Sequence, residues 1–217
     1  MTQWRLYDYA ASANCYKVRL ALAQLGANYE RVPVDIFDGD TLTDAYRVIN
    51  PARETPVLEV DRVARLAESG AILTYAADGT PLLPGDRWLR AQIVRWLLFE
   101  QTAVMSTIGG LRFRVLTGRL AVDNAEAVRR RDAALQALGL LDGHVSQTPF
   151  LVGARYTIAD IAVYGYAHLA AQAGIDVEPF PAFAAWVDRV TAQPGYVNDL
   201  EPYPPNASRQ AGLSVYG

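Results

Sequence analysis

A stretch rich in glycine and proline divides this chain into two parts with different hydrophobic patterning. Residues 78–87 read DGTPLLPGDR, a composition that favours neither a helix nor a strand. Strand and helix signals alternate before this stretch, whereas every segment after it has the spacing of helices. We therefore predict two domains, residues 1–78 and residues 88–217, joined by a linker at residues 79–87.

The first domain is predicted to follow the order βαβαββα. Apolar positions recur every three or four residues at Cys15, Val18, Leu22 and Leu25, and they predict a helix that ends at Gly26. The other predicted segments are strands at residues 4–9, 29–34, 55–60 and 63–67, and helices at residues 42–49 and 69–77. This order is typical of a thioredoxin-like α/β domain, in which a mixed sheet lies between helices.

The second domain is predicted to be all helical. Its helices are expected at residues 88–117, 124–145, 158–173 and 181–192. Gly109 and Gly110 weaken the first of them and predict a kink or an early end. Residues from Pro194 onward are expected to be irregular, and their aromatic side chains indicate a tail that packs on the body of the protein.

The sharpest local signal lies at residues 156–161, which read YTIADI. The Thr157 hydroxyl and the Asp160 carboxylate have the spacing of a capping box, and Tyr156 and Ile161 match the hydrophobic staple that accompanies it. We expect a core helix to begin at this point.

The composition excludes several classes of function. The net charge is −3 and the 20 basic residues are scattered, so no nucleic-acid partner is predicted. No apolar run approaches the length of a membrane span, and Met1 leads directly into the first strand without a targeting leader, so we predict a cytoplasmic protein with no membrane partner. With one cysteine and two histidines, neither an internal disulfide nor a metal site is predicted.

The start of the first predicted helix carries side chains suited to sulfur chemistry. Ser12, Asn14 and Cys15 lie where unpaired backbone N–H groups and the positive end of the helix dipole would stabilise a thiolate. Ser12 lies three residues before Cys15, which is the spacing of a CxxC redox pair whose first cysteine is replaced by serine. Cys15 also shares an apolar helix face with Val18, so the alternative is that it is a buried core residue.

Two further segments suit recognition of a peptide-like ligand. If the bond before Pro56 is cis, it turns the N–H and C=O of Thr55 outward, where an extended peptide can pair with them; alternatively, the proline only limits a strand edge. Glu68 and Ser69 fit an α-amino acid, because a carboxylate pairs with an ammonium group and a helix start with a hydroxyl suits a carboxylate. The alternative for Ser69 is plain helix capping.

The segments SANCYKVRL, TPVL and ESGAI, together with the capping box, resemble the cytosolic glutathione transferases, in particular bacterial serine-type or nu-like members. The resemblance implies the glutathione transferase fold, with glutathione as co-substrate and no metal. It assigns the γ-glutamyl group to Glu68 and Ser69, and the peptide of the glutathione cysteine to Thr55 before Pro56. Arg53 is a further expected contact, at a position where many relatives carry glycine.

The same resemblance implies an activity and its participants. Ser12 and Asn14 resemble the Thr-x-Asn of nu-type enzymes, which reduce disulfides with glutathione, and Tyr9 is a rival to Ser12 because tyrosine-type enzymes carry their hydroxyl at the end of the first strand. The acceptor, a hydrophobic electrophile or a disulfide, is expected to contact Tyr9, Phe99, Arg112 and Phe113. A homodimer with a role in detoxification is expected. The alternative is a catalytically weak interaction or regulatory protein on the same fold.

Overall fold

The computed structural model describes residues 3–209, which fall into two compact units. The division assigns Met1–Ala76 and Val197–Gly217 to the first unit and Ala77–Tyr196 to the second. The boundary thus lies at the start of the stretch that the sequence analysis identified. The described part of the tail, residues 197–209, groups with the first unit, whereas the sequence analysis placed it in the helical domain. Residues 210–217 of that predicted tail lie outside the described residues.

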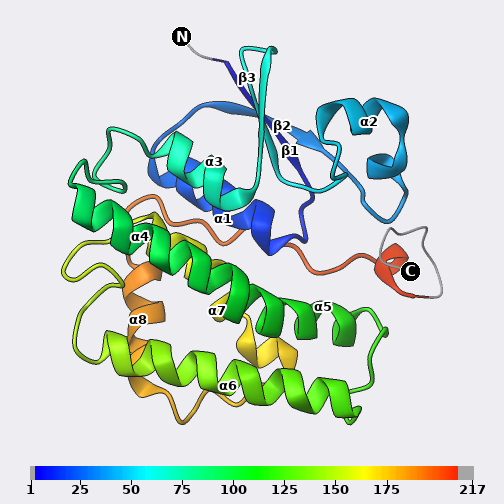
Figure 1. The fold of residues 1–217 in the computed structure, drawn as a ribbon. Helices are drawn as coiled ribbons and strands as arrows, with labels where there is room; N and C mark the ends of the chain where they lie inside the picture. The colour runs from blue at the N-terminus through cyan, green and yellow to red at the C-terminus, as the bar shows by residue number, and fades with distance from the viewer. Residues whose placement is uncertain (1–2, 210–217) are drawn as a thin grey trace. The chain divides into compact units, whose positions relative to one another are not determined.

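The first unit contains a four-stranded mixed sheet in the order β2-β1-β3-β4 (Figure 1). Strand β1 pairs in parallel with β2 and antiparallel with β3, which continues antiparallel to β4. The strands are β1 (Trp4–Asp8), β2 (Tyr29–Pro33), β3 (Val57–Val60) and β4 (Ala64–Ala67), and the helices are α1 (Ala13–Gln24), α2 (Asp44–Ile49) and α3 (Ser69–Ala76), with a short 3-10 turn η1 (Asp40–Leu42). The predicted order βαβαββα and the mixed sheet are confirmed.

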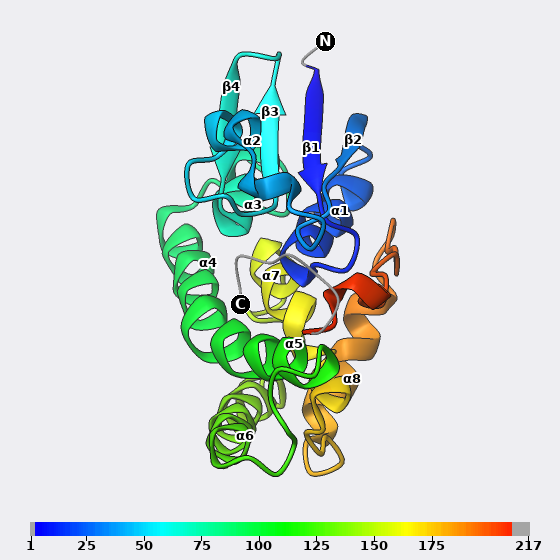
Figure 2. The same cartoon turned by 90° about the vertical axis from the view of Figure 1, so that its right-hand side faces the viewer.

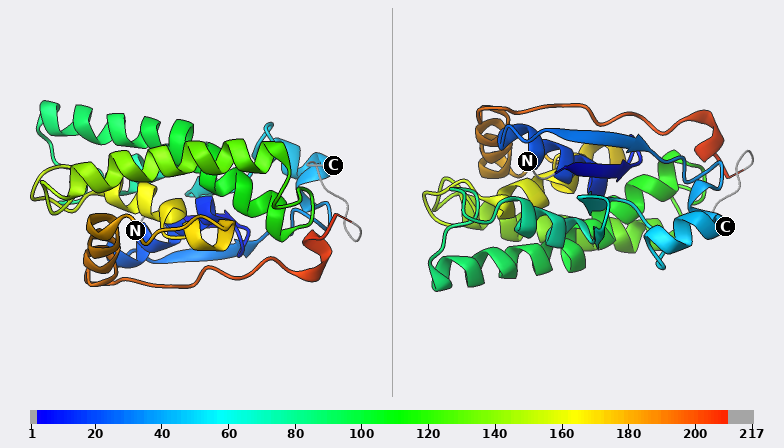
Figure 3. Two further views of the ribbon diagram at one scale, coloured as in Figure 1. Left: turned by 90° about the horizontal axis from the view of Figure 1, so that it is seen from below. Right: turned by 90° about the horizontal axis from the view of Figure 1, so that it is seen from above.

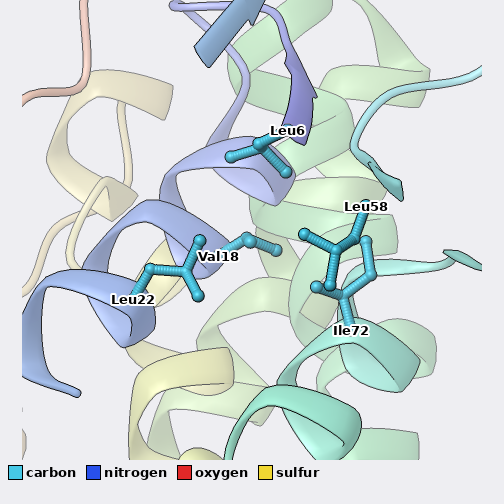
Figure 4. Packing of buried hydrophobic residues seen from close by; sticks show 5 residues of the cluster. All are labelled: Leu6, Val18, Leu22, Leu58 and Ile72. Atoms are coloured by element: carbon cyan, nitrogen blue, oxygen red, sulfur yellow. The ribbon is translucent and has the colours of Figure 1, made fainter. Parts of the chain in front are cut away.

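Alternation along β1 divides the core of this unit into two layers. Leu6 packs on the side of α1 and α3, where Figure 4 shows it gathered with the other apolar side chains of that cluster: Val18, Leu22, Leu58 and Ile72. Tyr7 points to the other side and packs with Val34, Tyr46 and Val57. Asp8, two residues after Leu6, therefore lies on the α1 side of the sheet.

The second unit is all helical, as predicted. Figure 2 labels its helices, and Figure 3 shows residues 87–116 (green) alongside residues 125–145 (yellow-green). It consists of α4 (Arg87–Phe99), the π-helical segment η2 (Glu100–Gly109), α5 (Gly110–Leu116), α6 (Ala125–Val145), α7 (Ile158–Ala167), η3 (Ala170–Ala173) and α8 (Pro181–Thr191). The middle of the long first helix, η2, packs against both α6 and α7. Within residues 3–209, no helix combines the length and apolar character that crossing a bilayer requires.

The long helix keeps its helical conformation through Gly109 and Gly110, where a kink or an early end was predicted. The irregularity takes the form of π-helical geometry over Glu100–Gly109 instead. A side chain at Gly109 would bring its Cβ within 2.6 Å of the Tyr166 ring. Glycine is therefore required there by close packing within the second unit.

The capping box at the start of α7 is confirmed. The Thr157 hydroxyl accepts a hydrogen bond from the N–H of Ala159, and the Asp160 carboxylate accepts one from the N–H of Thr157 at 3.0 Å. Asp160 is fully buried and also accepts the N–H of Leu151 at 2.9 Å and the indole N–H of Trp186 at 3.0 Å. Burial raises the pKa of Asp160 to about 6, and these hydrogen bonds oppose that rise. One carboxylate thus joins three segments of the second unit.

We expect Asp160→Ala to destabilise the protein far more than an ordinary cap substitution. The change leaves several buried donors without an acceptor and should cost about 3 kcal/mol or more. Thr157→Ala should cost about 1 kcal/mol. Asp86→Ala is the matched control, because the Asp86 carboxylate caps α4 at an exposed position through the N–H of Leu89 and should cost about 1 kcal/mol or less. Equal denaturant midpoints for Asp160→Ala and Asp86→Ala would contradict this account.

Candidate active site

Ser12 caps the N-terminus of α1 and holds a hydroxyl at its first turn. Its backbone is extended (φ −82°, ψ 122°), and its Oγ accepts a hydrogen bond from the N–H of Cys15 at 3.4 Å. Its own N–H donates to the carbonyl of Tyr9 at 3.0 Å. A hydroxyl that accepts through a lone pair still has a proton to donate. The cap therefore fixes the position of Oγ and leaves its O–H able to donate to a ligand.

Asn14 is oriented by a buried lysine that sequence reasoning did not include in the site. Lys17 is fully buried, and its Nζ donates to Asn14 Oδ1 at 2.8 Å. Because an ammonium group has only donors, it selects the carbonyl end of the amide, and the NH₂ end of Asn14 faces the other way. The only signal in the sequence was a lysine three residues after Asn14 within a largely apolar helix.

Cys15 lies in the core of the first unit. Its side chain is fully buried, and its Sγ accepts the N–H of Tyr9 at 3.4 Å. Burial raises the pKa of the thiol to about 12, and the nearby charge of Asp8 adds to that rise. The hydroxyl of Thr55 also lies within hydrogen-bond reach of the sulfur. At neutral pH this thiol stays protonated, and its environment favours the core alternative over a nucleophile.

The segment before β3 presents backbone groups of Thr55. The Thr55–Pro56 peptide bond is cis, and β3 begins at Val57. Asn50 Nδ2 and the hydroxyl of Tyr46 both donate to the carbonyl of Glu54, each at 3.0 Å, which holds the segment in place. Among residues 3–209, none forms a hydrogen bond with the N–H or C=O of Thr55. Both groups are available to an extended ligand.

Glu68 and Arg53 both have left-handed backbones that non-glycine residues rarely adopt. Their φ values are 68° and 59°, and Glu68 is exposed at the entry to α3, where its carbonyl accepts the N–H of Ile72 at 2.9 Å. Such conformations cluster at ligand-binding positions. Ser69, the first residue of α3, is buried. Burial raises the pKa of the Glu54 carboxyl, and the charge of Glu68 raises it further, so the two carboxylates lie close enough to repel. An ammonium group placed between them would relieve that repulsion.

The residues predicted for the acceptor are divided between the two units. Tyr9 belongs to the first unit, is 5% exposed, and packs edge-on against Phe37 with ring centroids 5.9 Å apart. In the second unit, Arg112 is buried and donates to Gln172. Phe99 packs on Trp96, and Phe113 lies under the guanidinium of Arg119. These contacts join residues of the second unit to one another and do not test a role in binding the acceptor. That role stays a prediction for Phe99, Arg112 and Phe113.

A buried charge cluster behind the site was missed by sequence reasoning. The Asp8 carboxylate is fully buried, and its two oxygens bind Arg19 of α1 and Arg31 of β2. Arg19 also binds Asp199 of the tail, with its Nε 2.9 Å from the nearer carboxylate oxygen. The sequence signal was an aspartate on the core-facing side of an apolar strand, but nothing local identifies its two partners, which lie 11 and 23 residues away.

Family models match both units. Residues 6–82 match the glutathione S-transferase N-terminal domain, and residues 89–194 match the glutathione S-transferase C-terminal domain. The chain belongs to the glutathione S-transferase family.

Several similar proteins match most of this chain. A solved glutathione S-transferase structure from Pseudomonas fluorescens Pf-5 is 39% identical with a TM-score of 0.87, and the match covers 91% of this chain and 99% of that one. A glutathione transferase family member from the same organism, solved with two glutathione bound, is 27% identical with a TM-score of 0.79, covering 91% and 92% of the two chains. The disulfide-bond oxidoreductase YfcG of Escherichia coli is 26% identical over 86% of this chain and 89% of that protein.

Some similar proteins are longer. Elongation factor 1-gamma of Artemia salina is 31% identical over 75% of this chain, but the match spans only 37% of that protein. The fold of a glutathione S-transferase is thus shared with proteins that carry further sequence, and fold alone does not assign an activity.

The burial of Cys15 predicts a thiol that is unreactive in the folded glutathione S-transferase. A thiol-specific disulfide reagent at neutral pH should label Cys15 on the order of 100-fold more slowly in the native protein than in denaturant, because both access and the thiolate fraction are small. Cys15→Ser is the matched control and should show no labelling in either state. Rapid native labelling would contradict the core assignment and favour Cys15 as a nucleophile.

Proposed function

We propose that this protein is a glutathione transferase in which the start of α1 activates the thiol of bound glutathione. One observation carries the proposal: the N-terminus of α1 presents donors suited to a thiolate, while the chain's only cysteine is buried with a raised pKa. The sulfur that these donors stabilise is therefore supplied by a ligand. The similar family member from Pseudomonas fluorescens that was solved with two glutathione bound supports glutathione as this ligand.

Ser12 and Asn14 supply the donors in this proposal. The Ser12 hydroxyl, fixed by its cap hydrogen bond, donates to the glutathione sulfur, and the NH₂ of Asn14, turned away from Lys17, adds a second donor. An alkyl thiol has a pKa of about 8.5, and each unit of depression corresponds to about 1.4 kcal/mol of thiolate stabilisation. Preorganised donors at a helix start supply energies of that size.

The remainder of glutathione fits the other groups of the first unit. The N–H and C=O of Thr55, presented before Pro56, pair with the backbone of the glutathione cysteine. The γ-glutamyl ammonium binds Glu68, and its carboxylate binds the start of α3 at Ser69. Arg53 offers a cation to the glycyl end. The left-handed backbone of Glu68 and the repulsion between Glu54 and Glu68 support an ammonium position at this point.

The reaction is nucleophilic attack by the thiolate. On an electrophilic carbon, the sulfur forms a bond to carbon as the bond to the leaving group breaks, and the leaving group departs with the electron pair. On a disulfide, the sulfur forms a mixed disulfide and expels the other sulfur as a thiolate. Tyr9, Phe99, Arg112 and Phe113 are the proposed acceptor contacts. The family resemblance also supports a cytoplasmic homodimer that acts in detoxification.

Two specific observations favour one of these two reactions. Similarity to the disulfide-bond oxidoreductase YfcG, together with the Ser12-x-Asn14 spacing, favours disulfide reduction among the acceptors. A catalytically weak regulatory protein is the alternative to an enzyme. Retention on immobilised glutathione followed by turnover of 1-chloro-2,4-dinitrobenzene and of a small disulfide distinguishes them, because a regulatory protein would bind without turning over either acceptor.

We expect Glu68→Gln to weaken glutathione binding by about tenfold or more. The substitution keeps the size of the side chain but removes the charge that binds the ammonium group, a loss of about 1.5 to 3 kcal/mol. Glu178→Gln is the matched control, because Glu178 is exposed in the second unit. Calorimetry should give a higher dissociation constant for Glu68→Gln alone. An unchanged constant would refute the assignment of Glu68 to the γ-glutamyl group.

A further inference from the structure

A cavity of about 470 Å³ lies within the first unit, beside the residues that lead into Ser12. Its walls come from the end of β1 and the following residues 9–11, from the end of β2, and from the tail at residues 201–204. This volume is in the range of small-molecule sites. The lining residue Ala11 directly precedes Ser12 in the chain, so the cavity wall and the residue proposed to hold the glutathione sulfur belong to the same turn.

The cavity is lined by a buried hydroxyl without a partner. Tyr9 is 95% buried, and its hydroxyl forms no hydrogen bond with any residue from 3 to 209. Burial raises the pKa of Tyr9, and the charges of Asp35 and Glu201, which also line the cavity, raise it further. The hydroxyl is therefore neutral at physiological pH and keeps a lone pair that no residue from 3 to 209 uses.

The charges around the cavity do not cancel. One cluster near the cavity has no net charge, because it contains two carboxylates and two guanidinium groups: Asp8, Asp199, Arg19 and Arg31. The Asp35 carboxylate accepts hydrogen bonds from neutral groups, including the N–H of Phe37 at 2.8 Å and the amide of Asn206 at 2.9 Å. These hydrogen bonds do not neutralise its negative charge.

Glu201 completes the excess of negative charge. It is exposed, and within residues 3–209 its carboxylate forms no hydrogen bond or ion pair. The rest of the wall includes Pro33, Pro202 and Pro204, which have no backbone N–H to offer an anion. Among the described lining residues the only cation is Arg31, whose charge is balanced by that of Asp8. An anionic ligand would meet two uncompensated carboxylates and few donors.

We propose that this cavity holds the distal substituent of the acceptor substrate and selects acceptors whose substituent is a small organic cation over those whose substituent is an anion. The inference rests on the proposed function, since it concerns the partner of the glutathione thiolate. The ammonium group is placed against Glu201, Asp35 and the Tyr9 hydroxyl oxygen, and the apolar body of the acceptor lies along the prolines.

Three acceptors that share a 4-chloro-3-nitrobenzyl group and carry a cationic, a neutral or an anionic substituent test this proposal. They are 4-chloro-3-nitrobenzylamine, 4-chloro-3-nitrobenzyl alcohol and 4-chloro-3-nitrophenylacetate, each attacked by glutathione with loss of chloride. The measured quantity is kcat/KM divided by the uncatalysed rate constant for the same acceptor, which removes differences in intrinsic reactivity. The ammonium acceptor should exceed the carboxylate acceptor by about tenfold or more.

Variants locate the selectivity in the cavity. Glu201→Gln should reduce the ratio between ammonium and carboxylate acceptors by about threefold or more, the effect of one partly exposed charge pair. Tyr9→Phe should lower turnover of the ammonium acceptor more than that of the carboxylate acceptor. Glu178→Gln, a charge removal in the second unit, should leave the ratio unchanged.

The outcomes separate this inference from the proposed function. Turnover of all three acceptors at equal corrected rates, or a ratio unaffected by Glu201→Gln, overturns the cation preference while glutathione transfer stands. Absence of turnover with every acceptor, in a protein that still binds glutathione, overturns both the proposed function and this inference.

Discussion

The buried carboxylate of Asp8 is the interaction on which the candidate site depends. Arg19 and Arg31 bind its two oxygens, and Arg19 forms a second ion pair with Asp199 in the tail. Burying these charges costs desolvation energy, so such a cluster contributes less to stability than to fixing one arrangement of its segments. The chain leaves β1 at Asp8, forms the turn that carries Ser12, and returns to the same carboxylate at Arg19. The turn is thereby held at both ends.

The tail gives this turn a second support. The carbonyl of Ala10 accepts the N–H of Glu201 at 3.3 Å, and the hydroxyl of Tyr16 donates to the carbonyl of Val197 at 2.8 Å. Ala10 and Glu201, which are far apart in the sequence, therefore lie side by side in the lining of the cavity. The same contacts that position Ser12 also place Glu201 at the cavity beside it. The tail therefore links the two proposed roles: it helps to position Ser12, which donates to the thiolate, and it carries Glu201, which selects the acceptor.

Local chemistry explains why the fold was largely readable from the sequence. The strand-like composition of residues 4–9, the helical spacing from Cys15 to Leu25, and the capping box at Thr157 and Asp160 are all properties of a few neighbouring residues. The structure confirms the elements they predict. Of the candidate site, Ser12, Thr55 and Glu68 were predicted from their residue types at element boundaries and from the family resemblance, and their roles remain predictions.

What the sequence did not show depends on distant partners. The π-helical segment is accompanied by the packing of Gly109 against Tyr166, 57 positions away, and no local pattern signals that contact. The grouping of the tail with the first unit depends on Arg19 and Asp199, which are 180 residues apart. Lys17 is likewise buried, although a charged side chain on a helix predicts exposure to solvent. In each case, contacts between distant residues determine the local structure, and the periodicity of the sequence carries no information about those contacts.

Titration of the glutathione thiol while it is bound tests the central claim most directly. The claim is that the capped start of α1, through the Ser12 hydroxyl, stabilises a thiolate that belongs to the ligand. Followed by the ultraviolet absorbance of the thiolate, the pKa of bound glutathione should fall at least about one unit below that of free glutathione, and Ser12→Ala should return it most of the way. Equal pKa values for bound and free glutathione, or an unchanged value in Ser12→Ala, would contradict the account.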